Sequence, residues 1–382
     1  MRKTITIGDL GTIITGKTPP TTNKNYYGDY AVFIKPTDIS ESSKFTYETE
    51  EMYSKLAAEK YESSLVPKGA ICVPCIGTIG TKMTMTHCAC YTNQSINSIV
   101  CNENYDNEYV YYLIKNFLPG LKAYNLGTAS GREYVSKSNF EKIQLVAEQD
   151  KTIQKRIGAI LSRYDSLIEN YQKQIKLLEE AAQRLYKEWF VDLRFPGHEN
   201  TKIVDGVPEG WEKKKVTDIL DVKYGKDHKL LKDGIIPVYG TGGIMRYADK
   251  SLYSGESVLI PRKGSLNNIM FVDETFWTID TMFYSVPKIE NAAKIVYFYL
   301  RGLDMYSMNI GAAVPSMTIS ILSDMNVLFP SINIRQSFEE FLNKYFDKIK
   351  ILSSQIRLLT EARDRLLPKL MNGEIDAIGE MA

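Results

Sequence analysis

Histidine and cysteine are both scarce in this sequence of 382 residues, which has 3 of the first and 5 of the second. The histidines (His87, His198 and His228) lack the spacing of metal ligands, and so few argue against an enzyme built on imidazole chemistry. The cysteines are odd in number and all lie before residue 102. They therefore do not form the disulfide framework of a small secreted domain.

An excess of charge and a long apolar run are missing as well. With 47 Lys+Arg against 46 Asp+Glu the net charge is +1. This balance argues against indiscriminate polyanion binding but permits selective reading of nucleic acid by a few side chains. No apolar run approaches the roughly 18 residues of a membrane span. The first residues have no apolar core followed by a cleavage site. We therefore expect a cytoplasmic protein without membrane contact.

The composition is that of an ordinary globular protein, with 44% hydrophobic and 24% charged residues. The sequence also contains an internal repeat, so that its main features occur twice. Residues 174–185 (QIKLLEEAAQRL) reappear as residues 355–366 (QIRLLTEARDRL). The order of the other matches is the same in both copies: Asp9-Leu10 with Asp218-Ile219, Gly16-Lys17 with Gly225-Lys226, residues 73–77 with 260–264, residues 110–114 with 296–300, and Val135-Ser136 with Ile319-Ser320. The order domain, helix, domain, helix follows.

Each copy ends in a segment with the pattern of a long helix. Steps of four and three residues land on apolar side chains, with Arg363 as the exception, and this period of about 3.5 residues is typical of a coiled-coil seam. About 40 residues at about 1.5 Å each make a rod of about 60 Å. We predict that the two seams pack on each other, rather than each on a domain surface. The predicted seam residues are Ile157, Leu161, Tyr164, Ile168, Tyr171, Ile175, Leu178, Leu185, Phe338, Leu342, Tyr345, Ile349, Leu352, Ile356, Leu359 and Leu366.

The segments outside the helices are rich in Gly, Thr, Ser, Asn and Tyr, and contain short β-favouring runs separated by turn signals. Short helices are expected at 50–60, 107–117 and 290–301. The sequence thus predicts two α+β domains with small mixed sheets, at residues 1–150 and 193–333. The helices are expected at 151–192 and 334–372, with a tail at 373–382.

Two motifs suggest other chemistry. Residues 11–18 (GTIITGKT) match the P-loop pattern, but a P-loop needs a helix that starts at its Lys, and Pro19-Pro20 disfavour one. Cys72, Cys75, Cys88 and Cys90 have a spacing compatible with zinc, yet the second copy has Leu259 and Arg262 where the first has Cys72 and Cys75. We expect no metal, although the sequence leaves this cluster open. Without a nucleophile elbow or a dinucleotide fingerprint, it predicts a binding protein.

Three segments carry a family resemblance: residues 185–195 (LYKEWFVDLRF), 206–212 (GVPEGWE) and 366–376 (LLPKLMNGEID). Together with the domain–helix–domain–helix order, they resemble the conserved regions of specificity (S) subunits of Type I restriction–modification systems. The resemblance covers essentially the whole chain. It departs from the family pattern at the first domain, since the GVPEGWE segment precedes the second domain only.

The resemblance implies a non-catalytic DNA-binding subunit. Each domain is then a target-recognition domain that reads one half of a bipartite site in double-stranded DNA, and the helices form an antiparallel coiled coil that spaces the domains and docks two methyltransferase (modification) subunits. No cofactor is expected on this chain, because S-adenosylmethionine, and ATP with Mg²⁺ where a restriction (translocase/nuclease) subunit is present, would be bound by partner subunits. Whether restriction subunits join the complex, the target sequence and the spacer length are not determined by the sequence.

Candidate DNA-contacting residues follow from the chemistry of base and phosphate recognition, in which Arg and Lys suit guanine, Asn and Gln suit adenine, and hydroxyl groups suit phosphates. Those in loop-like contexts of the first domain are Lys17, Thr18, Lys35, Thr78, Thr81, Lys82, Asn93, Gln94 and Arg132. Those of the second domain are Lys226, Tyr239, Thr241, Arg246, Arg262, Lys263, Asn267 and Asn268. We rank the Arg262-Lys263-Gly264 loop first, because the aligned loop of the first copy reads Cys75-Ile76-Gly77.

Two alternatives stay open from the sequence alone. One is a P-loop nucleotide-binding protein with a coiled-coil effector arm, for which Lys17 would be essential. The other is a coiled-coil scaffold that assembles with a methyltransferase but does not contact DNA.

Overall fold

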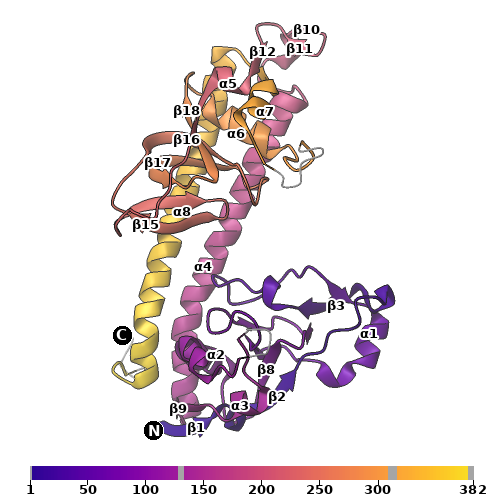
Figure 1. Ribbon diagram of the computed structural model, residues 1–382, viewed down its shortest axis with the longest axis vertical. Coiled ribbons are helices and arrows are strands. Elements are labelled where there is room, and N and C mark those ends of the chain that lie inside the picture. Colours follow the sequence, from indigo (N-terminus) through magenta and orange to yellow (C-terminus); the bar gives the residue numbers. More distant parts are fainter. Residues whose placement is uncertain (1, 128–132, 309–315, 377–382) are drawn as a thin grey trace. The chain divides into compact units, whose positions relative to one another are not determined.

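The computed structural model describes residues 2–127, 133–308 and 316–376 (Figure 1). The chain divides into two compact units, one made of Met1–Gln174 with Leu352–Ala382 and the other of Ile175–Ile351. Each unit contains one of the predicted domains together with the helix segments that pack on it. In each unit the hydrophobic core includes side chains of the domain and of the long helices.

The first unit is built on a four-stranded antiparallel sheet in the order β2-β8-β5-β6. Beside it lie a three-stranded sheet (β4-β3-β7) and the antiparallel pair β1-β9. The strands are β1 (Arg2–Thr6), β2 (Gly11–Thr15), β3 (Tyr27–Ile34), β4 (Met52–Tyr53), β5 (Ile71–Pro74), β6 (Thr84–Met85), β7 (Tyr91–Thr92), β8 (Ile96–Cys101) and β9 (Gln144–Glu148); the short helices are α1 (Lys55–Lys60), α2 (Asn107–Phe117) and α3 (Lys137–Glu141).

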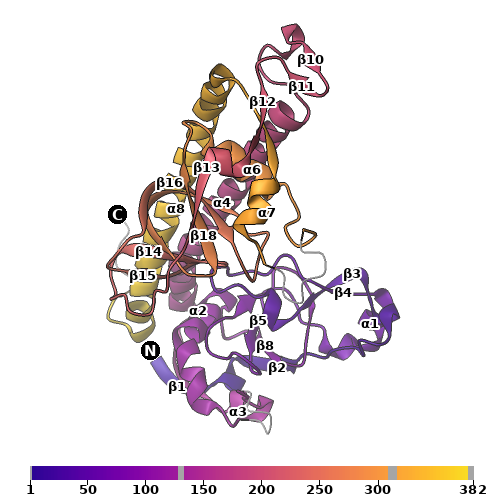
Figure 2. The ribbon, with the colours of Figure 1, turned by 45° about the horizontal axis from the view of Figure 1, so that its top comes forward.

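The second unit carries a six-stranded sheet in the order β13-β18-β16-β17-β14-β15, with the pairs β12-β19 and β10-β11 outside it. Figure 2 shows β13, β16 and β18 of this sheet next to α6 and α7. The strands are β10 (Ile203–Val204), β11 (Val207–Pro208), β12 (Glu212–Lys215), β13 (Leu220–Tyr224), β14 (Ile236–Gly240), β15 (Gly243–Ala248), β16 (Tyr253–Pro261), β17 (Met270–Thr278), β18 (Met282–Pro287) and β19 (Asn326–Phe329); the short helices are α5 (Val216–Ile219), α6 (Ala293–Arg301) and α7 (Ile319–Asp324).

Two long helices, α4 (Lys151–Tyr186) and α8 (Ile332–Asn372), stand where the sequence places them. Asp150 caps α4, because its side chain accepts hydrogen bonds from the backbone N–H groups of Thr152 and Ile153. A π-helical turn over Lys187–Val191 follows α4. The mixed α+β fold with two long helices agrees with the prediction.

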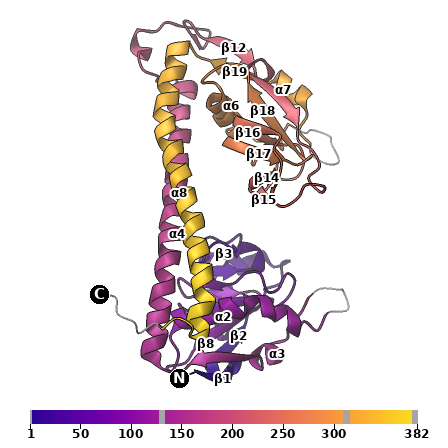
Figure 3. The same ribbon diagram turned by 90° about the vertical axis from the view of Figure 1, so that its left-hand side faces the viewer.

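The two helices pack against each other in opposite directions within each unit (Figure 3). In the first unit, Ile157 and Leu161 share one core with Leu367 and Leu370. In the second, the end of α4 meets the start of α8, and the rings of Trp189 and Phe338 are 5.5 Å apart.

The predicted seam residues all lie on buried or half-buried sides of their helices. Those that are buried are Ile157, Leu161, Ile168, Phe338, Leu342 and Leu352. Those that are half-buried are Tyr164, Tyr171, Ile175, Leu178, Leu185, Tyr345, Ile349, Ile356, Leu359 and Leu366.

The internal repeat is visible in matching hydrogen bonds. The backbone N–H of Val135 donates to Cys75 O over 2.8 Å, and the N–H of Met317 donates to Arg262 O over 2.9 Å. Ser136 and Thr318 then cap α3 and α7. Val135-Ser136 therefore corresponds to Met317-Thr318, and the predicted match to Ile319-Ser320 is wrong by two residues, because the preceding loops differ in length.

Among the described residues, no helix is both long and apolar enough to cross a membrane.

Candidate nucleic-acid interface

The Gly-Lys pairs occupy the same place in both units, directly after the first strand of the main sheet. The backbone N–H of Lys17 donates to Thr92 O, and that of Lys226 donates to Thr278 O, both over 2.9 Å. Each lysine side chain lies at an exposed position. The repeat thus presents one cation at an equivalent point of each sheet.

Glycine is required at these turns by close packing of the backbone. A Cβ atom at Gly16 would lie 2.1 Å from Thr92 O, and one at Gly225 would lie 2.1 Å from Ile279 O. Real Cβ atoms do not approach an oxygen so closely, so any side chain would push the turn away from the neighbouring strand. The position of the following lysine is fixed by this contact.

A second pair of equivalent positions carries different side chains. The N–H of Cys75 donates to Ser95 O over 2.7 Å, and the N–H of Arg262 donates to Thr281 O over 2.8 Å. Cys75 is 2% exposed, whereas Arg262 is half-buried. The same backbone frame therefore carries a small buried thiol in one unit and a guanidinium in the other.

The Arg262 guanidinium is held in place by three contacts. Its Nη1 donates to Asp280 O over 2.7 Å, and its Cζ lies 4.6 Å from the Tyr224 ring centroid and 5.1 Å from that of Phe283. Because the rings and the carbonyl already hold the guanidinium in one orientation, it loses less side-chain entropy when it binds a ligand. Lys263 next to it is exposed, so this loop presents two cations.

The first-unit candidates form two groups. Lys17, Thr18, Asn93 and Gln94 lie together, since the Thr18 hydroxyl contacts the Gln94 carboxamide oxygen and Lys17 N bonds to Thr92. Thr78, Thr81 and Lys82 lie on the loop after β5, where the two threonines are exposed and Lys82 is half-buried. Lys35 follows Ile34, whose carbonyl accepts a hydrogen bond from Asn93 N–H. The Lys35 side chain is bound elsewhere, with Nζ 2.6 Å from a Glu50 oxygen and 3.3 Å from one of Glu51. Arg132 lies outside the described residues.

Four second-unit candidates take part in bonds that order the loops. Asn268 Nδ2 donates to Thr241 O over 2.7 Å, Asn267 Nδ2 donates to Asp304 Oδ1 over 3.1 Å, and Arg246 pairs with Asp233 at 2.7 Å. Tyr239 lies away from the exposed surface. Its side chain is 8% exposed in a cluster with Phe276 and Tyr284, and its hydroxyl bonds to Glu274.

Sequence reasoning missed the exposed apolar residues near these loops. Tyr224 is 52% exposed beside Arg262, and Leu230 and Ile235 are 97% and 90% exposed on a segment that also carries Lys229 and Lys232. The signal was present as apolar residues interleaved with lysines directly after Gly225-Lys226.

The P-loop alternative does not fit this geometry. Gly11–Thr15 is a strand, and after it the chain forms no helix before a 3-10 turn at Lys24–Tyr26. A helix N-terminus to hold the phosphates is therefore missing at Lys17 in this described segment.

The cysteines make separate contacts. Cys72 Sγ lies 3.3 Å from Ser98 Oγ, and Cys75 Sγ lies 3.4 Å from Val73 O. Burial raises the pKa of both thiols to about 12. Within the part of the chain that the structure describes, no group of three or more His, Cys, Asp or Glu is placed to hold a metal ion.

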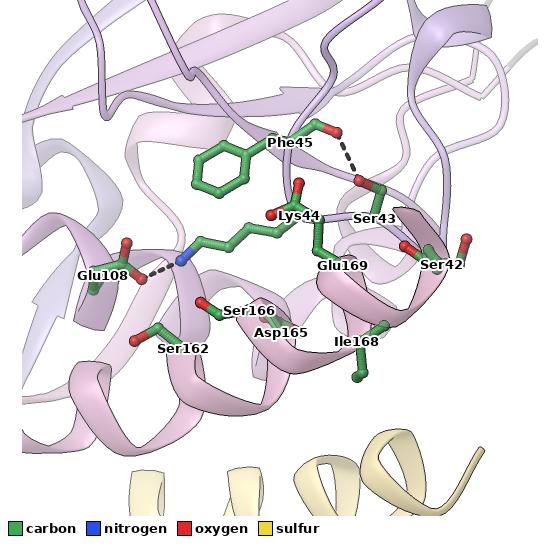
Figure 4. Close-up of a pocket in the computed structure, with 11 residues that line it drawn as sticks. Ser42, Ser43, Lys44, Phe45, Glu108, Ser162, Asp165, Ser166, Ile168 and Glu169 are labelled. Atoms are coloured by element: carbon green, nitrogen blue, oxygen red, sulfur yellow. Dashed lines mark hydrogen bonds and ion pairs between the residues drawn. The ribbon is translucent and has the colours of Figure 1, made fainter. Parts of the chain in front are cut away.

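A cavity of about 160 Å³ lies in the first unit between α4 and the loop at residues 42–45. Figure 4 shows Lys44 extending from this loop to Glu108 of α2, above the α4 side chains Ser162 and Asp165. Sites for small molecules have volumes of about 300 Å³ or more, and Lys44 and Asp165 are ion-paired with Glu108 and Arg363. The cavity is therefore part of the junction between domain and helix.

Residues 2–180 and 208–361 match the family model of the Type I restriction modification DNA specificity domain. The chain belongs to this family. It is a DNA sequence-specificity subunit of a Type I restriction–modification system and is not catalytic.

Similar proteins match this chain over all or part of its length. The chain is 28% identical over 97% of its residues to the Type I restriction enzyme MjaIX specificity subunit of Methanocaldococcus jannaschii, of which it covers 92%. It is 34% identical over 41% of its residues to the HindI specificity subunit of Haemophilus influenzae, of which it covers 35%. The crystal structure of the Type I S subunit from M. genitalium has the same fold, with a TM-score of 0.60 and 17% identity over 97% of this chain and 96% of that one.

Proposed function

We propose that the two units of this specificity subunit each read one half of a bipartite site in double-stranded DNA. The observation that carries this proposal is the pair Cys75 and Arg262, which have the same backbone hydrogen bonds but different chemistry. Two domains with one frame and different loop side chains suit two different half-sites. The long helices set the unread spacer between the half-sites, and methyltransferase subunits, joined in some assemblies by restriction subunits, carry out the chemistry.

In this proposal the residues after the main-sheet strands face the DNA. Lys17 and Lys226 would contact phosphates as point charges, while Arg262 has the planar donors that recognise a guanine edge. Tyr224 and Leu230 add apolar surface that can contact thymine methyl groups or base steps.

Arg262→Ala is expected to lower methylation by the assembled methyltransferase about 10- to 100-fold, because a bidentate base contact contributes about 1–3 kcal/mol of discrimination. Specificity should relax at one position of one half-site and stay unchanged in the other. Lys223→Ala is the matched control, since Lys223 pairs with Asp221 on β13 in the same unit, with its side chain 47% exposed.

Methylation rates on a library randomised at each position of the site would measure both effects. A uniform loss over all sequences would assign Arg262 to phosphate binding instead. Unchanged methylation would refute a reading role.

For the methyltransferase subunits we propose two equivalent docking points. Leu177 and Leu358 occupy the same position in the two helix repeats and are 63% and 53% exposed. A groove beside Leu177 has an apolar part and a charged rim, and is lined by Glu180, Ala181, Arg184, Leu185, Glu188 and Tyr345. A repeated apolar anchor suits two copies of one partner.

Leu177→Glu and Leu358→Glu should each weaken binding of one methyltransferase subunit by about 30-fold or more, the effect expected for loss of a hot-spot side chain. The double variant should bind neither. Leu167→Glu is the control, because Leu167 is also exposed, at 43%, but corresponds to Lys348 in the second repeat. Stoichiometry from native mass spectrometry checks this; full binding by the double variant would refute these docking points.

A further inference from the structure

A buried polar triad stands where the two helices meet in the first unit. Asp165 of α4 forms an ion pair with Arg363 of α8, and each residue is 7% exposed. The Tyr112 hydroxyl of α2 donates to the other Asp165 oxygen over 2.5 Å. Arg363 has a second partner in Asp364, whose side chain is 53% exposed.

The second unit has apolar residues at the three corresponding positions. The helix repeat matches Asp165 with Phe346 and Arg363 with Ala182, and the short-helix repeat matches Tyr112 with Phe298. Phe298 and Ala182 are each 1% exposed, and the rings of Phe298 and Phe346 are 6.2 Å apart. The three matched positions are therefore polar in the first unit and apolar in the second, where the buried ion pair Lys294–Glu339 lies at another place.

The difference in polarity between the matched positions affects which helices can pair. Because α4 and α8 have similar sequences, each could also pair with its own counterpart in a second copy of the chain. Two copies of the chain could exchange partners, so that α4 packs on α4 of the other copy and α8 packs on α8. The matching heptads would allow the same register in these self-pairs. Each α4 self-pair would then bury Asp165 against Ala182 of the other copy, twice, without its ion-pair partner Arg363.

In the α8 self-pair, the buried group that loses its partner is a cation instead of an anion. Arg363 would lie against Phe346 of the other copy, again twice, with Asp364 as its remaining partner. An uncompensated buried charge is strongly unfavourable, whereas the paired arrangement satisfies both groups. A single polar position that fixes register and partner is the best-attested use of such groups in coiled coils.

We propose that the Asp165–Arg363–Tyr112 triad makes the α4–α8 pair selective against self-pairing with a second copy of this chain. It keeps one copy of each recognition domain in every complex. On the function proposed above, the triad thereby keeps the DNA site asymmetric, because self-paired helices would bring together two identical recognition domains.

The test uses the full chain and needs no DNA, so its outcome is independent of the proposed recognition function. In the combined variant Tyr112→Phe, Asp165→Phe and Arg363→Ala, the first unit receives the residues of the second. After refolding, this variant is expected to form exchanged dimers with an affinity roughly a hundredfold above that of the parent chain. Sedimentation velocity over a range of protein concentrations measures this affinity.

Exchanged helices are identified by cross-linking a mixture of ¹⁵N-labelled and unlabelled chains. In an α4 self-pair with the register above, Lys173 of one copy comes near Lys176 of the other, so cross-links between differently labelled copies report the exchange. The charge-reversed variant Asp165→Arg with Arg363→Asp is the matched control. It keeps the two charges complementary and should stay monomeric.

A folded combined variant that stays monomeric would overturn the proposal, as would a parent chain that exchanges equally. Where the combined variant does not fold, Asp165→Leu with Arg363→Leu replaces it, because this pair removes both charges at similar volume. The same exchanged cross-links are then expected, and their absence counts against the triad.

Discussion

Replacing Arg363 by Leu should lower the free energy of unfolding of the first unit by about 3–5 kcal/mol. The change leaves the Asp165 carboxylate, 7% exposed, with the Tyr112 hydroxyl as its remaining bond. Removing one member of a buried ion pair costs this much because the other charge stays buried without compensation. Chemical denaturation followed by a probe in the first unit measures the loss.

The control for this prediction lies on the same helix. Arg357 pairs with Glu361 one turn away at 3.0 Å, but its side chain is 58% exposed. Arg357→Leu should therefore change the stability by less than about 0.5 kcal/mol. A loss of similar size in both variants would show that the effect belongs to the helix surface and not to the buried pair.

The choice of probe matters because the three tryptophans, Trp189, Trp211 and Trp277, all lie in the second unit. Tryptophan fluorescence therefore reports unfolding of the second unit. Hydrogen exchange of the buried α2 amides reports the first, where Tyr109 and Tyr112 are fully buried. We expect the α2 amides of Arg363→Leu to exchange faster, with little change in the fluorescence transition.

Arg363 also shows what the sequence could and could not predict. The heptad pattern identifies this position as the polar exception in an apolar seam, but its partner Asp165 is 198 residues away and next to the seam residue Tyr164. A pattern along one helix gives the buried side of that helix. It does not say which residues of two helices face each other, because that depends on their relative register.

The positions of the candidate recognition loops could be predicted from the sequence, but the exposure and contacts of their side chains could be predicted only in part. The repeat located Gly16-Lys17, Gly225-Lys226 and the Arg262 loop, since glycines in close contact keep the backbone in register. It selected Tyr239 as a DNA contact, although β14 is buried on both faces and that ring packs in a core cluster. Local residue chemistry cannot separate an exposed polar group from one that orders a loop, as Asn267 and Asn268 do.

Lengthening both long helices by one heptad is expected to abolish methylation of the native DNA site. Seven residues add about 10.5 Å to each helix, which corresponds to about 3 base pairs. The insertion would be made between Tyr171 and Ile175 of α4 and between Leu352 and Ile356 of α8, where the four-three stepping of the seam is kept. The two domains can then no longer contact both half-sites together.

The expected loss of methylation follows from the specific DNA affinity that is lost when one half-site is no longer contacted. Specific DNA binding exceeds non-specific binding by about 10³-fold or more, and a complex that engages one half-site loses much of this advantage. In a series of DNA sites whose spacers differ by single base pairs, the preferred spacer should be longer than the native one.

The control replaces the native heptad by another of equal length with the same seam residues, and should keep the native preference. An unchanged spacer preference in the lengthened protein would refute the role of the helices as a ruler.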